Sequence, residues 1–308
     1  AVAQRLQSAS SLSLLLRNPL GFVWKYGMRL RAPQAGEEPL VLDALSFGNL
    51  VHEVLDVALR ELVMSAQTGP AMDVHSVVRT AVQKVSDSWE ALRPIPPKLL
   101  WRRSLSEVEQ LATYAMQTTH TSDGTLHSFS EVPFGGAKPK TDAPLPWDAA
   151  AVVEIPGTDF RINGYIDRLD IAADKKFAHV YDYKTGKAPK DAIVFNKGQE
   201  LQRCLYAFAV RALLGNTVGV FAALLYLREQ QQLTLDDAEG TLAQLQQFLL
   251  TARANLLSGA ALPGIAAGGD YDDLAFALPA NAASGYCTRK MPAILHRLGP
   301  ATAVWEAK

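Results

Sequence analysis

Two short polar stretches, GYIDRLD at 164–170 and DYKTGK at 182–187, each place an aspartate inside a segment with the composition of a β-strand. Aspartate is disfavoured in strands, so these two carboxylates call for a compensating role. Paired carboxylates can bind a hard divalent cation such as Mg²⁺ through their oxygens. A lysine follows the second aspartate by two residues, and its amine could position a water, help to deprotonate it, or stabilise developing negative charge. Together these residue types indicate metal-assisted hydrolysis of a phosphate ester.

The two stretches are expected to pair as a β-hairpin, because the polar sequence DKKF at 174–177 lies between them and suits a tight turn. With a two-residue turn, Asp167 lies directly opposite Asp182, and opposed side chains share one face about 5 Å apart. Side chains alternate along a strand, so Lys184 lies on that same face. The alternative is a solvated hairpin whose Asp–Lys pair lies on an exposed surface.

The helix expected from about 197 to 214 carries Gln202 and Tyr206, which lie four residues apart and therefore on one side. Either side chain could reach a backbone phosphate or orient Lys184. A surface glutamine and a half-buried tyrosine are the structural alternative.

His52 lies beside the apolar face of a helix expected from 46 to about 64, near Gly48. Its ring could bind a metal through nitrogen or contact a phosphate. A histidine at the flank of a helix is also commonly structural, and that alternative stays open.

The elements that must position these residues follow from the periodicity of the chain. The first 120 residues are expected to be mainly helical, in a Ser-capped segment at 10–31 that breaks at Pro19 and in helices at 46–64, 73–92 and 104–119. Strands are expected at 126–134, 150–155, 159–171, 177–184 and 217–228, with helices at 197–214 and 234–257 and a mostly loop-like tail from 259. The helix at 234–257 is expected to start at Thr234, with Asp237 in a capping box.

This order of elements predicts a mainly helical subdomain at 1–125, which carries Gly48 and His52, and an α/β core at 126–308 with a C-terminal helix and a loop-rich tail. We expect the two parts to form one integrated domain. The helical part comes first in the chain, so His52 must reach the strands across a helix–sheet contact.

The composition is that of a globular protein with a substantial core: 308 residues, 48% hydrophobic and 20% charged. The formal net charge is −1, so nucleic-acid binding would depend on a local basic groove and not on bulk charge. The two cysteines, Cys204 and Cys287, argue against a disulfide scaffold and suit a reducing cytosol. We find no signal-peptide pattern and no apolar run long enough to span a membrane, and we expect a cytoplasmic protein.

The sequence lacks the motifs of other phosphate-binding sites and of nucleophilic active sites. TGK at 185–187 resembles the end of a phosphate-binding loop, but no glycine precedes Gly186 by five residues. The chain has no Gly-x-Ser-x-Gly motif and no Cys/His spacing typical of zinc sites.

Four motifs, in order along the chain, resemble those of the RecB/AddB-type nucleases of the PD-(D/E)xK superfamily. They are Gly48-x3-His52, Gly164-x2-Asp167-Arg168, Asp182-x-Lys184-Thr185-Gly186 and Gln202-x3-Tyr206. SASSLSLLLRNPLGFVWKYGMRL at 8–30 is similar to the segment that opens AddB-type C-terminal nuclease domains, and SEVPF at 130–134 to the acidic strand before the first catalytic aspartate. The resemblance covers nearly the whole chain and is weakest beyond about residue 260.

The resemblance implies an α/β fold of the restriction-endonuclease-like type, a mixed β-sheet flanked by helices with a helical N-terminal subdomain. It implies catalytic roles for Asp167, Asp182, Lys184, Gln202 and Tyr206. It also implies that Mg²⁺ or Mn²⁺ is bound by His52, Asp167, Asp182 and the carbonyl of Tyr183. Glu131 is expected to help order the site. We expect DNA contacts from Arg168, Lys187, Lys190 and Lys197.

The resemblance further implies a metal-dependent deoxyribonuclease, an exonuclease acting on single strands or duplex ends in a helicase–nuclease system for DNA-end processing and recombinational repair. A helicase domain or subunit is therefore an expected partner, and no membrane is involved. Many AddB-type domains hold an iron–sulfur cluster on four cysteines. Here Asn18 occupies the first position and the tail offers only Cys287, so we expect no cluster.

Two alternatives stay open. One is a catalytically silent DNA-binding or scaffold module of a helicase–nuclease complex, which would keep the fold without turnover. The other is a stand-alone repair endonuclease, which would keep the chemistry and change the substrate.

Overall fold

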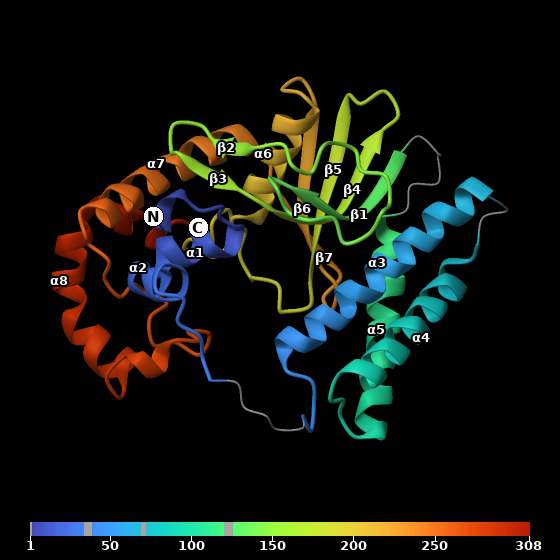
Figure 1. Ribbon diagram of the computed structural model, residues 1–308, viewed down its shortest axis with the longest axis horizontal. Helices are drawn as coiled ribbons and strands as arrows, with labels where there is room; N and C mark the ends of the chain where they lie inside the picture. Colours follow the sequence, from blue (N-terminus) through green and yellow to red (C-terminus); the bar gives the residue numbers. More distant parts are fainter. Residues whose placement is uncertain (1, 34–38, 69–71, 120–125) are drawn as a thin grey trace.

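The computed structural model describes residues 2–33, 39–68, 72–119 and 126–308, and it shows a mixed β-sheet with helices on both faces (Figure 1). The sheet has five strands in the order β1-β4-β5-β6-β7. Their bounds are β1 Leu126–Phe134, β4 Gly164–Ala172, β5 Phe177–Lys184, β6 Gly219–Tyr226 and β7 Gln231–Thr234. A separate two-stranded sheet consists of β2 Val153–Ile155 and β3 Phe160–Ile162. The α/β fold expected from the sequence is confirmed.

The sheet is mixed because β5 and β6 run parallel while the other neighbouring pairs are antiparallel. Parallel neighbours need a crossover connection, and α6 (Gln202–Leu214) provides it between β5 and β6. This crossover brings the start of α6 beside the end of β5, where the DYKTGK stretch lies.

The β4–β5 hairpin carries both aspartates of interest. It pairs Arg168 with Tyr181 and Leu169 with Val180, which is the register expected from the turn. The strands are joined by residues 173–176 instead of a two-residue turn; one extra residue on each side leaves the register unchanged. The ladder ends at the Arg168–Tyr181 pair, so Asp167 and Asp182 lie just past its last rung.

A first apolar core fills the space between one face of the sheet and α6, α7 (Ala238–Leu257) and the two ends of the chain. The N-terminal helices α1 (Ala9–Arg17) and α2 (Pro19–Phe22) belong to this core through Leu12, Leu15, Leu16 and Phe22. The tail packs over them, with the Trp305 indole donating to the carbonyl of Leu16 at 2.8 Å. The N- and C-termini therefore lie close together, beside α1 (Figure 1).

A second apolar core lies on the other face of the sheet, under the layer formed by α3 (Ala44–Thr68), α4 (Val74–Leu92) and α5 (Lys98–Thr119) (Figure 1). Tyr183 and Leu225 are the residues of β5 and β6 that reach into it. Trp89 of α4 and Trp101 of α5 stack at 6.0 Å, and the Trp89 indole donates to Glu53 of α3 at 2.6 Å. This contact fixes the helix that carries His52.

The remaining helical segments are short or lie in the tail. They are α8 Thr288–Leu298, the 3-10 segments η1 Val2–Gln4, η3 Ala275–Ala277 and η5 Gly299–Glu306, and the π-helical segments η2 Val23–Gly27 and η4 Ala282–Cys287. None of the helices among the described residues is both long and apolar enough to cross a membrane.

Several element boundaries differ from the sequence predictions; the strand expected at 159–171, for example, is divided into β3 and β4. The helix expected from Thr234 begins at Ala238, because residues 231–234 form the edge strand β7 and Asp237 caps the helix by accepting from the Gly240 N–H. The helix expected from 104 already starts at Lys98, directly after the proline-rich segment. The helix expected from 197 starts at Gln202. The boundary expected after residue 125 falls at 120–125, outside the described residues.

Candidate active site

Asp167 lies where strand β4 interrupts its regular alternation. Ile166, Leu169 and Ile171 all pack in the first core, although strict alternation would place Ile166 on the opposite face from the other two. The neighbouring strand β1 bends at the same level, where Glu131 has a left-handed backbone with φ +47°. Such a conformation costs a non-glycine residue about 1–3 kcal/mol and is typical of functional sites. At this bend the carboxylates of Asp167 and Glu131 are turned away from the two faces of the sheet.

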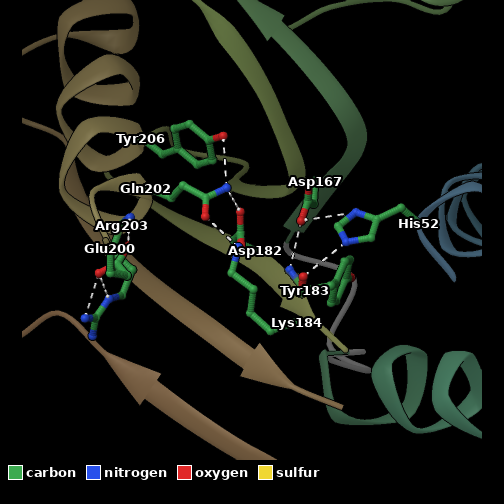
Figure 2. Close-up of polar contacts among 9 residues, drawn as sticks. All are labelled: His52, Asp167, Asp182, Tyr183, Lys184, Glu200, Gln202, Arg203 and Tyr206. Atoms are coloured by element: carbon green, nitrogen blue, oxygen red, sulfur yellow. Dashed lines mark hydrogen bonds and ion pairs between the residues drawn. The ribbon is translucent and has the colours of Figure 1, made fainter. Parts of the chain in front are cut away.

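The freed carboxylate of Asp167 meets His52 of α3 and the backbone of Tyr183 (Figure 2). Asp167 Oδ2 accepts from the Tyr183 N–H at 2.8 Å and lies 3.5 Å from His52 Nδ1. His52 Nε2 lies 3.1 Å from the Tyr183 carbonyl oxygen. Among the described residues, His52, Glu131 and Asp167 each offer a ligand atom, and these atoms all lie within 4.8 Å of one another. We call these three residues and the Tyr183 carbonyl the metal half of the site.

The donor set of the metal half fits a hard divalent cation. It consists of two carboxylates, one imidazole and one backbone carbonyl, and carboxylate and carbonyl oxygens suit Mg²⁺ and Mn²⁺. No thiolate contributes, because Cys204 is buried in the first core and Cys287 in a separate small cluster of the tail. The metal half could therefore hold Mg²⁺ or Mn²⁺.

A second group, the lysine half, consists of Asp182, Lys184, Gln202 and Tyr206 (Figure 2). The Gln202 amide bridges its two charged members, donating to Asp182 Oδ1 at 2.5 Å and accepting from Lys184 Nζ at 2.5 Å. Lys184 also forms an ion pair with Asp182. The Gln202 amide lies 3.5 Å from the Tyr206 hydroxyl. Gln202 thus orients the lysine, as one interpretation of the sequence proposed.

The first turn of α6 is anchored by a buried ion pair between Glu200 and Arg203 (Figure 2). Arg203 is 2% exposed and also donates to the carbonyls of Thr234, at the end of β7, and Ile193. A buried guanidinium needs several acceptors to offset its lost hydration, and here it has them. The start of α6 is thereby fixed to the sheet edge, and Gln202 with it.

In the metal half, the Asp167 carboxylate and the His52 imidazole stabilise each other's charged forms. Burial alone would raise the pKa of Asp167, but His52 and, less strongly, Lys184 hold that pKa below its usual value. Burial opposes the charged form of His52, yet Asp167 outweighs it and raises the pKa of His52 to about 9. Both ring nitrogens face acceptors, which is the arrangement of a protonated imidazole.

In the lysine half, burial raises the pKa of Asp182 to about 6, while the charge of Lys184 opposes this and that of Asp167 adds to it. Burial disfavours the charged form of Lys184, but Asp182 more than offsets it, and the pKa of Lys184 rises above its usual value. Lys184 therefore carries its positive charge at neutral pH. A permanently charged ammonium can stabilise negative charge but cannot serve as a base.

A cavity of 610 Å³ opens beside the two halves. It is lined by Ala44, Leu45, Gly48, Asn49, His52, Glu53, Asp56, Glu131, Lys140, Tyr183, Lys184, Thr185 and Gly186. The cavity brings His52, Glu131, Tyr183 and Lys184 to one surface, and Asp167 lies directly behind it in contact with His52 and the Tyr183 N–H. Its volume suits a nucleotide-sized group.

The residues expected from the sequence to contact DNA differ in how exposed they are. Lys187, Lys190 and Lys197 are exposed, as a backbone contact requires. Arg168 is not: it is 3% exposed and donates to both oxygens of the buried Asp170, at 2.9 and 3.0 Å. Its neighbour in the motif, Asp167, points to the site, while Arg168 packs on the opposite side. A direct DNA contact by Arg168 is therefore inconsistent with the structure.

Sequence reasoning missed Glu53, Asp56 and Lys140, which line the cavity. Asp56 lies one helical turn after His52, and this spacing could have identified it. Asp56 accepts from Ser130 Oγ at 2.6 Å and pairs with Arg60. Lys140 comes from an irregular loop, where no periodicity predicts which way a side chain lies.

Comparison with protein families finds one match that spans nearly all of these elements. The model described as PD-(D/E)XK nuclease superfamily matches residues 7–287. Among curated proteins, none matches the chain.

Proposed function

The chain belongs to the PD-(D/E)XK nuclease superfamily, and from this premise we propose that it is a divalent-metal-dependent deoxyribonuclease that hydrolyses phosphodiester bonds. The observation that carries the proposal is the meeting of two complementary groups at one cavity. One is the His52, Glu131 and Asp167 cluster, and the other is the Lys184 cation held by Asp182 and Gln202.

The residues that would hold Mg²⁺ or Mn²⁺ are His52, Asp167 and the Tyr183 carbonyl, with Glu131 and Asp182 as the adjoining carboxylates. When bound, such an ion polarises a phosphoryl oxygen and lowers the pKa of an attacking water. Because His52 would lose its proton on binding the ion, the carboxylates of Asp167, Glu131 and Asp182 would then offset the charge of the ion despite the nearby Lys184.

The side chains of the lysine half would act on the scissile phosphate. Lys184 supplies a charge that stabilises the additional negative charge of the transition state. Gln202 fixes the direction of its ammonium, and Tyr206 packs against Gln202 and limits the orientation of the amide. Preorganised charge of this kind is effective because it needs no rearrangement when the phosphate reacts.

We further propose the more specific assignment to RecB/AddB-type nucleases. In this role the protein would be an exonuclease acting on single strands or duplex ends in the cytoplasm, together with a helicase domain or subunit, in DNA-end processing. The order of the four motifs supports this assignment. Lys187, Lys190 and Lys197, all exposed, are the proposed DNA contacts. We propose no iron–sulfur cluster, and the visible absorbance of such a cluster should be missing from the purified protein.

End-labelled DNA, single- and double-stranded, incubated with the protein and Mg²⁺ or Mn²⁺ tests the proposal. We expect cleavage that requires the metal and is lost in Lys184→Ala. Degradation of linear but not circular DNA would favour the exonuclease over the stand-alone endonuclease. Cleavage that persists in Lys184→Ala would contradict the assignment of the site. Mn²⁺ binding without cleavage by the wild-type chain would favour the silent DNA-binding module.

A further inference from the structure

Lys140 is a cavity-lining cation that the proposed chemistry does not use. Its ammonium lies 2.6 Å from Glu131 Oε2 and 4.9 Å above the centre of the Tyr165 ring. The Tyr165 hydroxyl donates to the carbonyl of Lys138 at 2.7 Å. Tyr165 belongs to β4, two residues before Asp167, so the strand that carries the aspartate also holds this loop over the cavity. Lys140 is thus held at the site by specific contacts.

The charged residues around the cavity differ in how many hydrogen bonds and ion pairs hold them in place. Glu53 accepts from Trp89 and Arg93, and Asp56 accepts from Ser130 and pairs with Arg60. Lys184 is held by Asp182 and Gln202 and is 29% exposed. Lys140 is 49% exposed, and its carboxylate partner, Glu131, is one of the three clustered metal-binding candidates.

Glu131 therefore has two competing uses. In this structure its carboxylate, 11% exposed, is neutralised by Lys140. A divalent cation held with His52 and Asp167 would neutralise the same carboxylate and repel the ammonium beside it. Lysine is suited to such an exchange, because its charge sits on a long, flexible stem and needs no fixed geometry.

We propose that Lys140 is a DNA-binding residue of this site: its ammonium, paired with Glu131 in this structure, moves to a backbone phosphate of the substrate when Glu131 binds a metal. The inference rests on the proposed nuclease function and adds to it the contact that holds the strand at the loop side of the cavity. A phosphate is the matching ligand, because the other carboxylates of the cavity, Glu53 and Asp56, already have partners, and a released ammonium then needs an anion from outside the protein.

The alternative is that Lys140 only keeps Glu131 in place. Lys138 provides the matched control, because it lies on the same loop and is exposed, and it is not among the residues that line the cavity. Lys138→Ala removes an equal charge two residues away and leaves its carbonyl contact with Tyr165 available. Lys140→Arg keeps the charge, whereas Lys140→Ala removes it.

Equilibrium binding of a fluorescent single-stranded oligonucleotide, with Mn²⁺ and in the Lys184→Ala background that prevents cleavage, measures the contact directly. Each phosphate contact to a single strand contributes about 0.7 to the slope of log affinity against log salt concentration. We expect Lys140→Ala to reduce this slope by about that amount and to weaken binding about three- to tenfold at low salt. Lys138→Ala should leave the slope unchanged, and Lys140→Arg should retain it.

Calorimetric titration with Mn²⁺ in the absence of DNA separates the two roles. If Lys140 competes for Glu131, Lys140→Ala should bind Mn²⁺ at least as tightly as the parent protein. A salt slope equal to that of Lys138→Ala would overturn the proposal, as would a loss of Mn²⁺ affinity, since the DNA defect would then come from the metal site. If Lys140→Ala does not fold, Lys140→Gln answers the same question. Failure of the parent protein to bind DNA at all would instead refute the proposed function.

Discussion

Asp167 and Asp182 are the same residue type on neighbouring strands, yet the protein gives them opposite electrostatic environments. Asp167 faces a protonated His52, which holds the pKa of the carboxyl below its usual value in spite of burial. Asp182 is 2% exposed, and burial raises its pKa to about 6 although Lys184 is its direct partner. The two carboxylates are therefore not an interchangeable pair. Asp167 lies in the cluster that could hold a metal, whereas Asp182, also expected from the sequence to bind the metal, contacts Lys184 and Gln202.

The two aspartates differ in environment because each carboxylate contacts a different helix. The bend at Asp167 turns its carboxylate toward α3, in the layer over the second core, while Asp182 contacts Gln202 at the start of α6, in the layer over the first core. The active site thus lies where the two helical layers approach one end of the sheet. Each layer contributes one side chain to the candidate site, His52 from α3 and Gln202 from α6.

The largest expected effect separates catalysis from metal binding. Lys184→Ala should lower kcat by about 10²- to 10⁴-fold, because it removes the preorganised charge at the phosphate. Mn²⁺ affinity should stay near the wild-type value, since Lys184 is not among the metal-binding candidates. Steady-state kinetics and calorimetry measure the two effects. Lys176→Ala, in the exposed turn of the same hairpin, is the control and should change neither.

A substitution in the metal half should act mainly on metal affinity. Asp167→Asn should weaken Mn²⁺ binding by at least about tenfold, because loss of a carboxylate ligand exceeds the effect usual for supporting residues. Calorimetry on the folded variant measures this, with the surface change Asp159→Asn as the control. Unchanged Mn²⁺ affinity in Asp167→Asn would show that the cation is held elsewhere.

Metal binding to the metal half should depend on pH through His52. The pKa of His52 is raised to about 9 in the ion-free protein, so a cation must displace its proton at neutral pH. Mn²⁺ affinity should therefore rise about tenfold per pH unit between pH 7 and 8, and level off above pH 9. The same raised pKa stabilises the ion-free fold below the unfolded value of 6.5, a contribution lost as the pH rises through about 9.

Titrating Mn²⁺ affinity against pH in wild type and in His52→Gln tests this explanation. Glutamine keeps a polar side chain without a titrating proton, so the slope between pH 7 and 8 should flatten. A slope that is as steep in His52→Gln would assign the displaced proton to another group.

The smallest effect should come from the outer edge of the lysine half. Tyr206→Phe removes a hydroxyl that lies 3.5 Å from the Gln202 amide and leaves the ring packed against Phe134. A single neutral hydrogen bond contributes about 0.5–1.5 kcal/mol, so kcat should fall about two- to tenfold, with KM for DNA unchanged. A loss as large as that of Lys184→Ala would mean that the tyrosine hydroxyl touches the substrate itself.

Much of the scaffold was predictable because its signals are local. Alternation and turn chemistry placed the β4–β5 hairpin in its observed register, and helical spacing placed Gln202 and Tyr206 on one side of α6. The short edge strand β7 was missed because its sequence, QQLT, is polar and brief. An edge strand is defined by its neighbour β6 more than by its own residues.

The amino-acid sequence by itself determined which residue types are available at the site and in what order, together with the strands and helices that carry His52, Asp167, Asp182, Lys184 and Gln202. Only the tertiary structure decided which carboxylate faces the imidazole and which the lysine, that Arg168 turns inward to Asp170, and that Lys140 reaches Glu131. These outcomes depend on a bend in paired strands and on contacts between distant segments. The periodicity of a sequence predicts on which face of a helix or strand a side chain lies, whereas packing between elements decides which residues that side chain contacts.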